Sequence, residues 1–204
     1  MSAVERYAEA EIPTVLGPFR IVVYRFGGDP DDEHLAIVRG NVTGAEDVLT
    51  RVHSECLTGE VLGSLKCDCR EQLDMAMAAV ARAELGVIVY LRQEGRGIGL
   101  GNKIRAYALQ AEGADTVEAN LALGFAADLR SYDMAATIVR DLGVASVALM
   151  TNNPQKLAGL EQAGIKIARH VPHWADDHEH NRSYLEAKVA KLGHIAGSGG
   201  RKES

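Results

Sequence analysis

The sequence contains no apolar run that approaches the length of a membrane span, and we therefore expect no membrane partner. It is also poor in cations, since 22 Lys and Arg stand against 28 Asp and Glu, for a net charge of −6. That balance argues against broad electrostatic binding to a nucleic acid polymer. The first seven residues contain neither the apolar segment nor the cleavage site of a signal peptide, so we predict a cytoplasmic protein.

Cysteine is scarce as well, and all three cysteines lie within one short window, as Cys56, Cys67 and Cys69. The spacing C-x10-C-x-C is typical of three thiolates gathered on one metal ion, and sulfur ligands favour zinc. Three protein ligands leave one position for water, which a zinc ion can activate near neutral pH. The pattern therefore predicts a catalytic zinc site.

Three other interpretations of the cysteines remain open. One disulfide and a free thiol would fit the odd number, but disulfides belong to oxidising compartments. Free cysteines are also common as inert core residues, although clustering in one polar window argues against that role. A closed structural zinc site needs a fourth ligand, for which His53 is a candidate.

Strand and helix patterns alternate along the second half of the chain, and two strand patterns joined by a turn precede them. No internal repeat or linker is apparent. We therefore predict one α/β domain, a single mixed sheet flanked by helices, over residues 1–195, and a disordered tail at 196–204. Strands are expected at 21–26, 34–39, 86–91, 145–150 and 165–168, and helices at 70–85, 102–112, 132–142, 154–163 and 184–191.

The few cations are unevenly distributed along the chain. Four of them lie between Arg92 and Arg105, where Glu94 is the single acid. A local basic pocket on an acidic protein suits a small anionic substrate better than a polymer. The loop at 92–101 also has glycine at four alternating positions, between an apolar strand pattern and a helix pattern. Backbone N–H groups exposed by glycines, together with a helix N-terminus, predict a phosphate or nucleotide site.

The familiar glycine motifs do not apply to this loop. The Walker A pattern is absent, and the dinucleotide-binding pattern fails because position 100 is leucine. A flexible surface turn is the alternative, since alternating glycines suit that too. Arg96 inside the loop and Lys103 just beyond it favour anion binding.

Other polar residues are ambiguous when each is taken alone. Glu55 is either a surface acid or a carboxylate that manages protons beside the zinc water, and Tyr107 is either packing or a phenol donor. Asp128 and Arg130 have the spacing of an ordinary surface ion pair. Residues 151–156 follow a predicted strand directly, at the end where α/β proteins bind ligands.

Taken together, several segments closely resemble the GTP cyclohydrolase II family. The resemblance extends from about residue 10 to 194, and long blocks in one order are more specific than any single motif. Members of that family hydrolyse GTP to 2,5-diamino-6-(5-phosphoribosylamino)pyrimidin-4(3H)-one, formate and pyrophosphate, the first step of riboflavin synthesis. The blocks are residues 51–59, 67–69, 92–99, 102–110, 115–120, 123–130 and 151–156.

The resemblance implies a role for each matched residue. The three cysteines match the zinc ligands, with one Zn²⁺ per subunit, and Tyr107 matches a tyrosine that assists at the imidazole ring. Arg130 matches a proposed nucleophile at the α-phosphorus, and Asp128 matches a proposed proton acceptor. Because a guanidinium stays protonated at ordinary pH, charge stabilisation by Arg130 is the simpler role. The positions that match GTP contacts are Arg51, Val52, His53, Ser54, Glu55, Gln72, Glu94, Gly95, Arg96, Thr116, Thr151 and Lys156.

The same resemblance implies further partners and two alternatives. Mg²⁺ is expected on the triphosphate, Glu94 is expected to accept from guanine N1–H and N2–H₂, and a homodimer is expected. No synthase domain of the kind that some relatives carry precedes the matched region, so a monofunctional enzyme is expected. The alternatives are a paralogue that opens the ring but keeps the formyl group, and a silent GTP-binding module with structural zinc.

Overall fold

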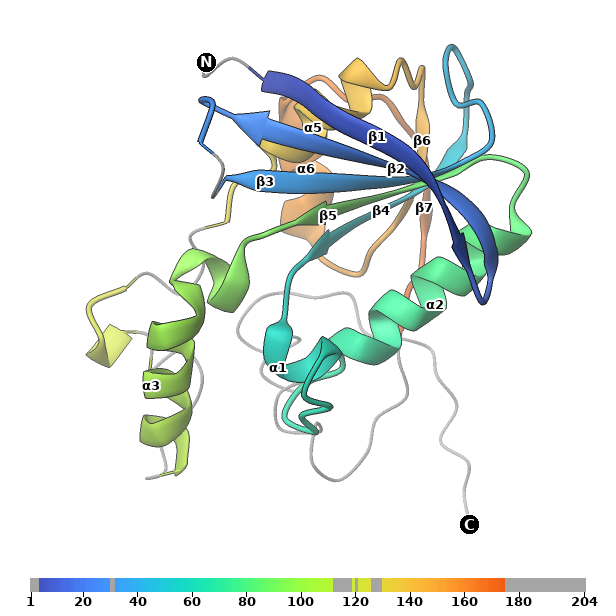
Figure 1. The fold of residues 1–204 in the computed structure, drawn as a ribbon. Helices are drawn as coiled ribbons and strands as arrows, with labels where there is room; N and C mark the ends of the chain where they lie inside the picture. The colour runs from blue at the N-terminus through green and yellow to red at the C-terminus, as the bar shows by residue number, and fades with distance from the viewer. Residues whose placement is uncertain (1–3, 30–31, 112–118, 120, 126–129, 175–204) are drawn as a thin grey trace, which may run out of the picture.

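The structure is a computed structural model that describes residues 4–29, 32–111, 119, 121–125 and 130–174. Its centre is one seven-stranded sheet with the strand order β1-β2-β3-β5-β4-β6-β7 (Figure 1). The strands are β1 (Val4–Thr14), β2 (Gly17–Phe26), β3 (Glu33–Arg39), β4 (Val48–Ser54), β5 (Gly86–Leu91), β6 (Val147–Met150) and β7 (Ile167–Val171). The helices are α1 (Leu57–Glu60), α2 (Cys69–Arg82), the 3₁₀ helix η1 (Glu94–Gly97), α3 (Gly99–Ala111), α5 (Asp133–Asp141) and α6 (Pro154–Gln162).

The sheet has an antiparallel half and a parallel half. Strands β1, β2, β3 and β5 pair antiparallel in that order, whereas β5, β4, β6 and β7 pair parallel. The mixed sheet flanked by helices that the sequence predicts is thus confirmed.

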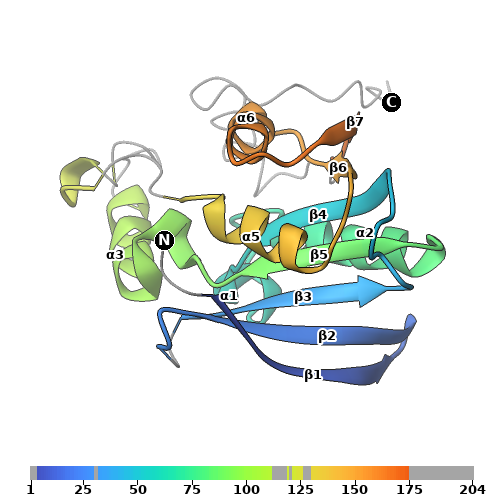
Figure 2. The same cartoon turned by 90° about the horizontal axis from the view of Figure 1, so that it is seen from above.

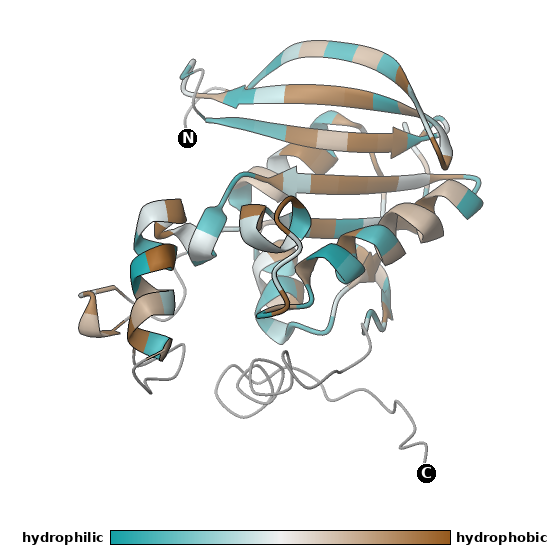
Figure 3. Ribbon diagram, turned by 60° about the horizontal axis from the view of Figure 1, so that its bottom comes forward, coloured by the Kyte–Doolittle hydropathy of each residue, from teal (hydrophilic) through white to brown (hydrophobic). Residues whose placement is uncertain are grey.

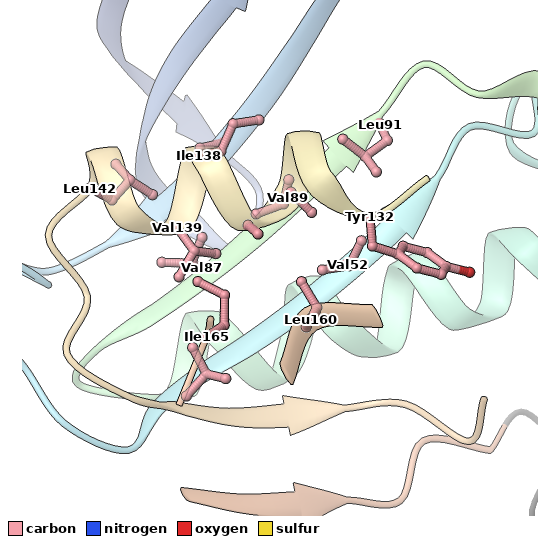
Figure 4. Close-up of a cluster of buried hydrophobic side chains, with 14 of the residues drawn as sticks. Val52, Val87, Val89, Leu91, Tyr132, Ile138, Val139, Leu142, Leu160 and Ile165 are labelled. Carbon is pink, nitrogen blue, oxygen red and sulfur yellow. The ribbon is translucent and has the colours of Figure 1, made fainter. Parts of the chain in front are cut away.

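Helices cover the two faces of the sheet unequally. Helix α2 packs on one face, through Ala76 and Val80 against Ile88. Helices α5 and α6 pack on the other, as the view from above shows (Figure 2). Strand β5 alternates between these layers, so Val87, Val89 and Leu91 lie under α5 (Figure 4). Apolar residues accordingly concentrate along the middle strands (Figure 3), as burial on both faces requires.

The predicted elements from 21 to 163 are present, with ends that differ by a few residues. The last strand begins two residues later and ends three residues later than predicted, at Ile167–Val171. Strands β1 and β4 were not predicted. Strand β1 is an exposed edge strand with little apolar pattern, and β4 is a central strand interrupted by Arg51 and His53. The predicted helix at 184–191 and the tail at 196–204 lie outside the described residues.

The order of the parallel strands determines where a ligand site can form. From β4 the chain passes through α2 to β5 on one side, and it later returns through α5 to β6 on the other side of β4. Such a reversal opens a crevice at the carboxyl ends of the strands. Among the described residues, no helix combines the length and the apolar composition that a bilayer crossing requires.

Candidate active site

A cleft of about 1150 Å³, counted out to the solvent, lies at the carboxyl ends of the parallel strands. Each of these strands is followed within a few residues by side chains that line it: Glu55 and Cys56 after β4, Gln93 and Glu94 after β5, Thr151, Asn152 and Asn153 after β6, and His173 and Trp174 after β7. Because the site is assembled from four strand ends, its residues are far apart in the sequence.

The three cysteines meet on one wall of this cleft. Cys56 precedes α1, Cys69 is the first residue of α2, and Cys67 lies in the turn between them. Their Sγ atoms all lie within 4.8 Å of one another, and those of Cys56 and Cys67 are 3.6 Å apart. Two thiolates on one tetrahedral zinc, each about 2.3 Å from the metal, lie about 3.8 Å apart. The sulfurs therefore have the spacing that a shared zinc ion requires.

A small residue makes room for this cluster. A Cβ at Gly59 would lie 2.9 Å from Cys67 Sγ and 3.2 Å from Cys56 Sγ. The hydrogen bond from the Cys67 thiol, together with Lys103, lowers the pKa of Cys56. These contacts favour the thiolate form of Cys56, which is the form that binds metal.

His53 does not complete the cluster as a fourth ligand. Within the described part of the chain, the group of candidate metal ligands contains the three sulfurs and no histidine or carboxylate. The Nε2 atom of His53 instead lies 2.7 Å from Glu60 Oε1. Three donors and a cleft in front of them favour the open, catalytic type of zinc site over the closed, structural type.

Glu60 organises this wall, and the sequence did not point to it. Its carboxylate accepts from His53 Nε2, from the backbone N–H of Cys56 at 3.0 Å and from the Tyr90 hydroxyl at 2.5 Å. Because a carboxylate only accepts, we assign the proton of His53 to Nε2, and burial lowers the pKa of His53 so that the ring is neutral. Nδ1 of His53 is then an acceptor.

Arg51 is buried against α2, the helix that Cys69 begins. It donates to the carbonyl of Met150 at 3.0 Å and to Gln72 Oε1 at 2.5 Å. Gln72 in turn donates to Asp68 at 2.6 Å. Burial lowers the pKa of Arg51 to about 10, so the guanidinium remains charged at neutral pH.

The glycine loop is compact rather than a flexible turn. Gly95 and Arg96 both have left-handed backbones, with φ of 63° and 60°. The buried carboxylate of Glu94 accepts from Gly95 N at 2.8 Å, from Lys103 Nζ at 2.7 Å and from Leu57 N at 2.7 Å. A non-glycine residue in this region is strained by about 1–3 kcal/mol, which is characteristic of functional sites.

Tyr107 and Lys156 approach the cleft from α3 and α6. Burial raises the pKa of Tyr107, so its phenol stays protonated, and Lys66 and Lys103 lie 5.2 and 5.8 Å from the centre of its ring. Lys156 is buried and donates to the carbonyl of Val52 at 2.8 Å. The side chain of Val52 itself packs in the core, where Figure 4 labels it.

Most of the residues predicted for the site line this one cleft. Two of them, Thr116 and Asp128, lie outside the described residues. The cleft also includes Asn152 and Asn153, which belong to the segment 151–156 that was expected at a ligand site. His173 and Trp174 line it too; no sequence pattern pointed to them, and their only signal is that they follow a strand. The predicted residues on the cleft are Arg51, His53, Ser54, Glu55, Cys56, Cys67, Cys69, Gln72, Glu94, Gly95, Arg96, Tyr107, Arg130, Thr151 and Lys156.

Several buried polar atoms of the cleft make no hydrogen bond within the described residues. They are Arg51 Nε, His53 Nδ1, Ser54 Oγ and Gln93 Oε1. Buried polar atoms of this kind are usually satisfied by a ligand or by ordered water. The cleft therefore offers both donors and acceptors to a polar ligand.

Comparisons with known proteins agree on one family. The family described as GTP cyclohydrolase II matches residues 5–172. GTP cyclohydrolase-2 of Aeromonas hydrophila is 52% identical over 195 residues, which cover 96% of this chain and 98% of that protein. The riboflavin biosynthesis protein RibBA of Bacillus subtilis is 54% identical over 194 residues, which cover 94% of this chain and 48% of that protein. The chain thus spans about half the length of its RibBA relatives.

Among solved structures, the crystal structure of RibBX, a two domain 3,4-dihydroxy-2-butanone 4-phosphate synthase from A. baumannii, has a TM-score of 0.46 and 25% identity. The match covers 85% of this chain and 40% of that chain.

Proposed function

The chain belongs to the GTP cyclohydrolase II family, and on this premise we propose that it hydrolyses GTP to the diaminopyrimidinone nucleotide, formate and pyrophosphate, as the first step of riboflavin synthesis. The observation that carries the proposal is that three cysteine sulfurs lie on the same cleft as Arg51, Arg96 and Lys156. A metal centre beside a basic pocket suits hydrolysis of a nucleotide. The catalytic domain comprises residues 1–195.

The cysteine sulfurs would hold one Zn²⁺, which fits three clustered sulfur donors with no protein ligand opposite them among the described residues. When bound, zinc supplies Lewis acidity and activates water for attack on the imidazole ring of guanine. The side chains of the chain itself position the substrate. Tyr107, whose phenol is protonated, donates a hydrogen bond toward that ring.

The triphosphate is proposed to lie against the cations of the cleft. Arg51 is fixed by two hydrogen bonds and keeps one nitrogen, Nε, for a ligand. Arg96 and Arg130 also line the cleft, and a guanidinium there stabilises the charge that develops when pyrophosphate leaves. Mg²⁺ on the phosphates would neutralise the rest.

The test is incubation of the zinc-loaded full chain with GTP and Mg²⁺, following formate, pyrophosphate and nucleotide mass together. Equal amounts of formate and pyrophosphate, with a diaminopyrimidinone monophosphate, are expected. Pyrophosphate with the formyl group kept on the product would indicate the ring-opening paralogue. Recovery of intact GTP would contradict the proposed hydrolysis and would favour the silent GTP-binding module.

Binding is separable from turnover because the only tryptophan of the chain, Trp174, lines the cleft. GTP should therefore change the intrinsic fluorescence on binding, even in a variant without activity. A fluorescence change without products would support the silent module. If GTP causes no fluorescence change and no products form, GTP is not the ligand. The homodimer and the cytoplasmic location remain predictions from the sequence.

A further inference from the structure

Lys103 makes a contact that the proposed chemistry does not explain. Its Nζ atom lies 3.0 Å from Cys56 Sγ and 2.7 Å from Glu94 Oε1. The side chains of Lys103 and Glu94 are only 11% and 9% exposed. A lysine normally extends its ammonium into water, so an ammonium held between a sulfur and a carboxylate has a specific role.

Glu94 fixes this lysine and the first cysteine at once. Its Oε1 atom accepts from Lys103 and from Gly95 N, while its Oε2 atom accepts from Leu57 N, next to Cys56, at 2.7 Å. The glycine at position 95 allows the close approach, since a Cβ there would lie 3.1 Å from Lys103 Cβ. The glycine loop is thereby attached to the segment that carries Cys56.

The same contacts limit what Glu94 can offer to a base. A carboxylate has about four acceptor positions, and three of them are engaged inside the protein. Reading guanine N1–H and N2–H₂ together would require a free position on each oxygen. Glu94 has one free position for a base, on Oε2, while its other three contacts hold Lys103, Gly95 and Leu57.

We propose that Lys103 is a positioning residue of the metal centre, which donates to the Cys56 sulfur and, through Glu94, holds the glycine loop against the cysteine cluster. The proposal rests on the proposed zinc site. Three thiolates would exceed the charge of one Zn²⁺ by one negative charge. The Lys103–Glu94 pair is neutral as a whole, but it presents its positive end to the Cys56 sulfur and so stabilises that negative charge locally. Donation to the sulfur also reduces the electron density that Cys56 gives to a metal.

The experiment measures metal binding in the full chain. Zinc affinity is determined by competition with a chelator, and the sulfur-to-cobalt charge-transfer band is recorded after Co²⁺ substitution. The variants are Lys103→Met, the smaller polar Lys103→Gln in case the first variant does not fold, and Lys103→Arg. The matched control is Lys66→Met, because Lys66 lies beside the same tyrosine ring, is exposed, and has no contact with a sulfur among the described hydrogen bonds.

Removing the ammonium should weaken zinc binding by about 10- to 100-fold, the usual effect of losing an outer-shell partner of a ligand. The charge-transfer band should move to lower energy in Lys103→Met and Lys103→Gln, because the sulfur becomes a better electron donor. Lys103→Arg should recover much of the affinity, and Lys66→Met should match the wild type. A purely structural lysine would not shift the band.

Wild-type affinity together with an unshifted band in Lys103→Met or Lys103→Gln would overturn the proposal, as would an equal loss in Lys66→Met. A wild-type chain that binds no zinc would overturn it together with the zinc assignment. Because the comparison measures metal binding alone, it decides the role of Lys103 whether or not GTP is turned over.

Discussion

The parallel strands and the antiparallel strands of this sheet differ in what their polar side chains contact. In the antiparallel half, Tyr24 of β2 donates to Asp141 at 2.8 Å, and Arg6 of β1 donates to the same carboxylate at 2.8 Å. In the parallel half, Arg51 and His53 each keep a buried nitrogen that is not satisfied within the described residues.

The difference follows from how each kind of strand pair is connected. The antiparallel strands β1, β2 and β3 follow one another in the chain, and a tight turn at Val15 and Leu16 joins the first two, so little chain accumulates at their ends. Parallel neighbours need crossovers, and their carboxyl ends therefore lie at one edge. At neutral pH, substitutions of the polar cleft residues at the ends of the parallel strands should change function more than stability, whereas substitutions at the Tyr24–Asp141 contact should change stability alone.

Loss of a metal ligand should give the largest effect. Cys67→Ser replaces one of three sulfurs by a weaker ligand, and both zinc content and formate release should fall to background. Metal analysis and product assay measure this, and thermal unfolding of the metal-free proteins should show little difference from the wild type. Retained activity in a variant without metal would remove the zinc mechanism.

Crowding the cysteine cluster should give the next effect. In Gly59→Ala the new methyl group meets two sulfurs and Cys69 Cβ at 2.9 to 3.3 Å. The ligands must move, so zinc affinity should fall by about 10-fold or more. The control is Gly101→Ala on α3, where a Cβ meets nothing within 4 Å. If both variants bind zinc as tightly as the wild type, the cysteines around position 59 can move aside without loss of affinity, and the prediction is wrong.

A smaller effect is expected from pH. Burial lowers the pKa of His173 to about 4, against about 6.5 when unfolded. Below pH 6.5 the unfolded chain takes up a proton that the folded chain does not. Stability should therefore fall as the pH drops from about 6.5 toward 4, by up to roughly 3 kcal/mol from this residue. Urea unfolding at several pH values should show a shallower loss for His173→Gln, which can still donate to Gln72.

The control for this pH series is His170→Gln, because His170 is only half-buried. A loss equally steep in His173→Gln and in the wild type would assign the acid sensitivity to other groups.

The smallest effect should come from the antiparallel half. Tyr24→Phe removes a buried hydroxyl but leaves Arg6 on Asp141, so the free energy of unfolding should fall by about 1 kcal/mol. The melting temperature should drop by a few degrees, with unchanged zinc affinity and GTP turnover. A change in turnover would mean that the two halves are not separable in this way.

Sequence patterns predicted the cysteine cluster because all three ligands lie within one window, and they predicted β5 because its residues are apolar throughout. The same patterns missed β4, because the polar residues Arg51 and His53 interrupt its apolar sequence. Their hydrogen-bond partners, Gln72 and Glu60, come close to them only in the folded chain. The contact between Lys103 and Cys56 spans 47 residues of sequence. No local pattern encodes such a pairing, although each residue was recognisable singly.

Arg96, with its left-handed backbone between two glycines, has a consequence for the evolution of this chain. Glycine at position 96 would adopt φ near 60° without strain, and stability should rise. A library selected only for resistance to heat should therefore accumulate Arg96→Gly, whereas one selected for turnover should retain arginine. Thermal stability and turnover would then favour different residues at position 96. The residue found there in selected variants would show which of the two properties was selected.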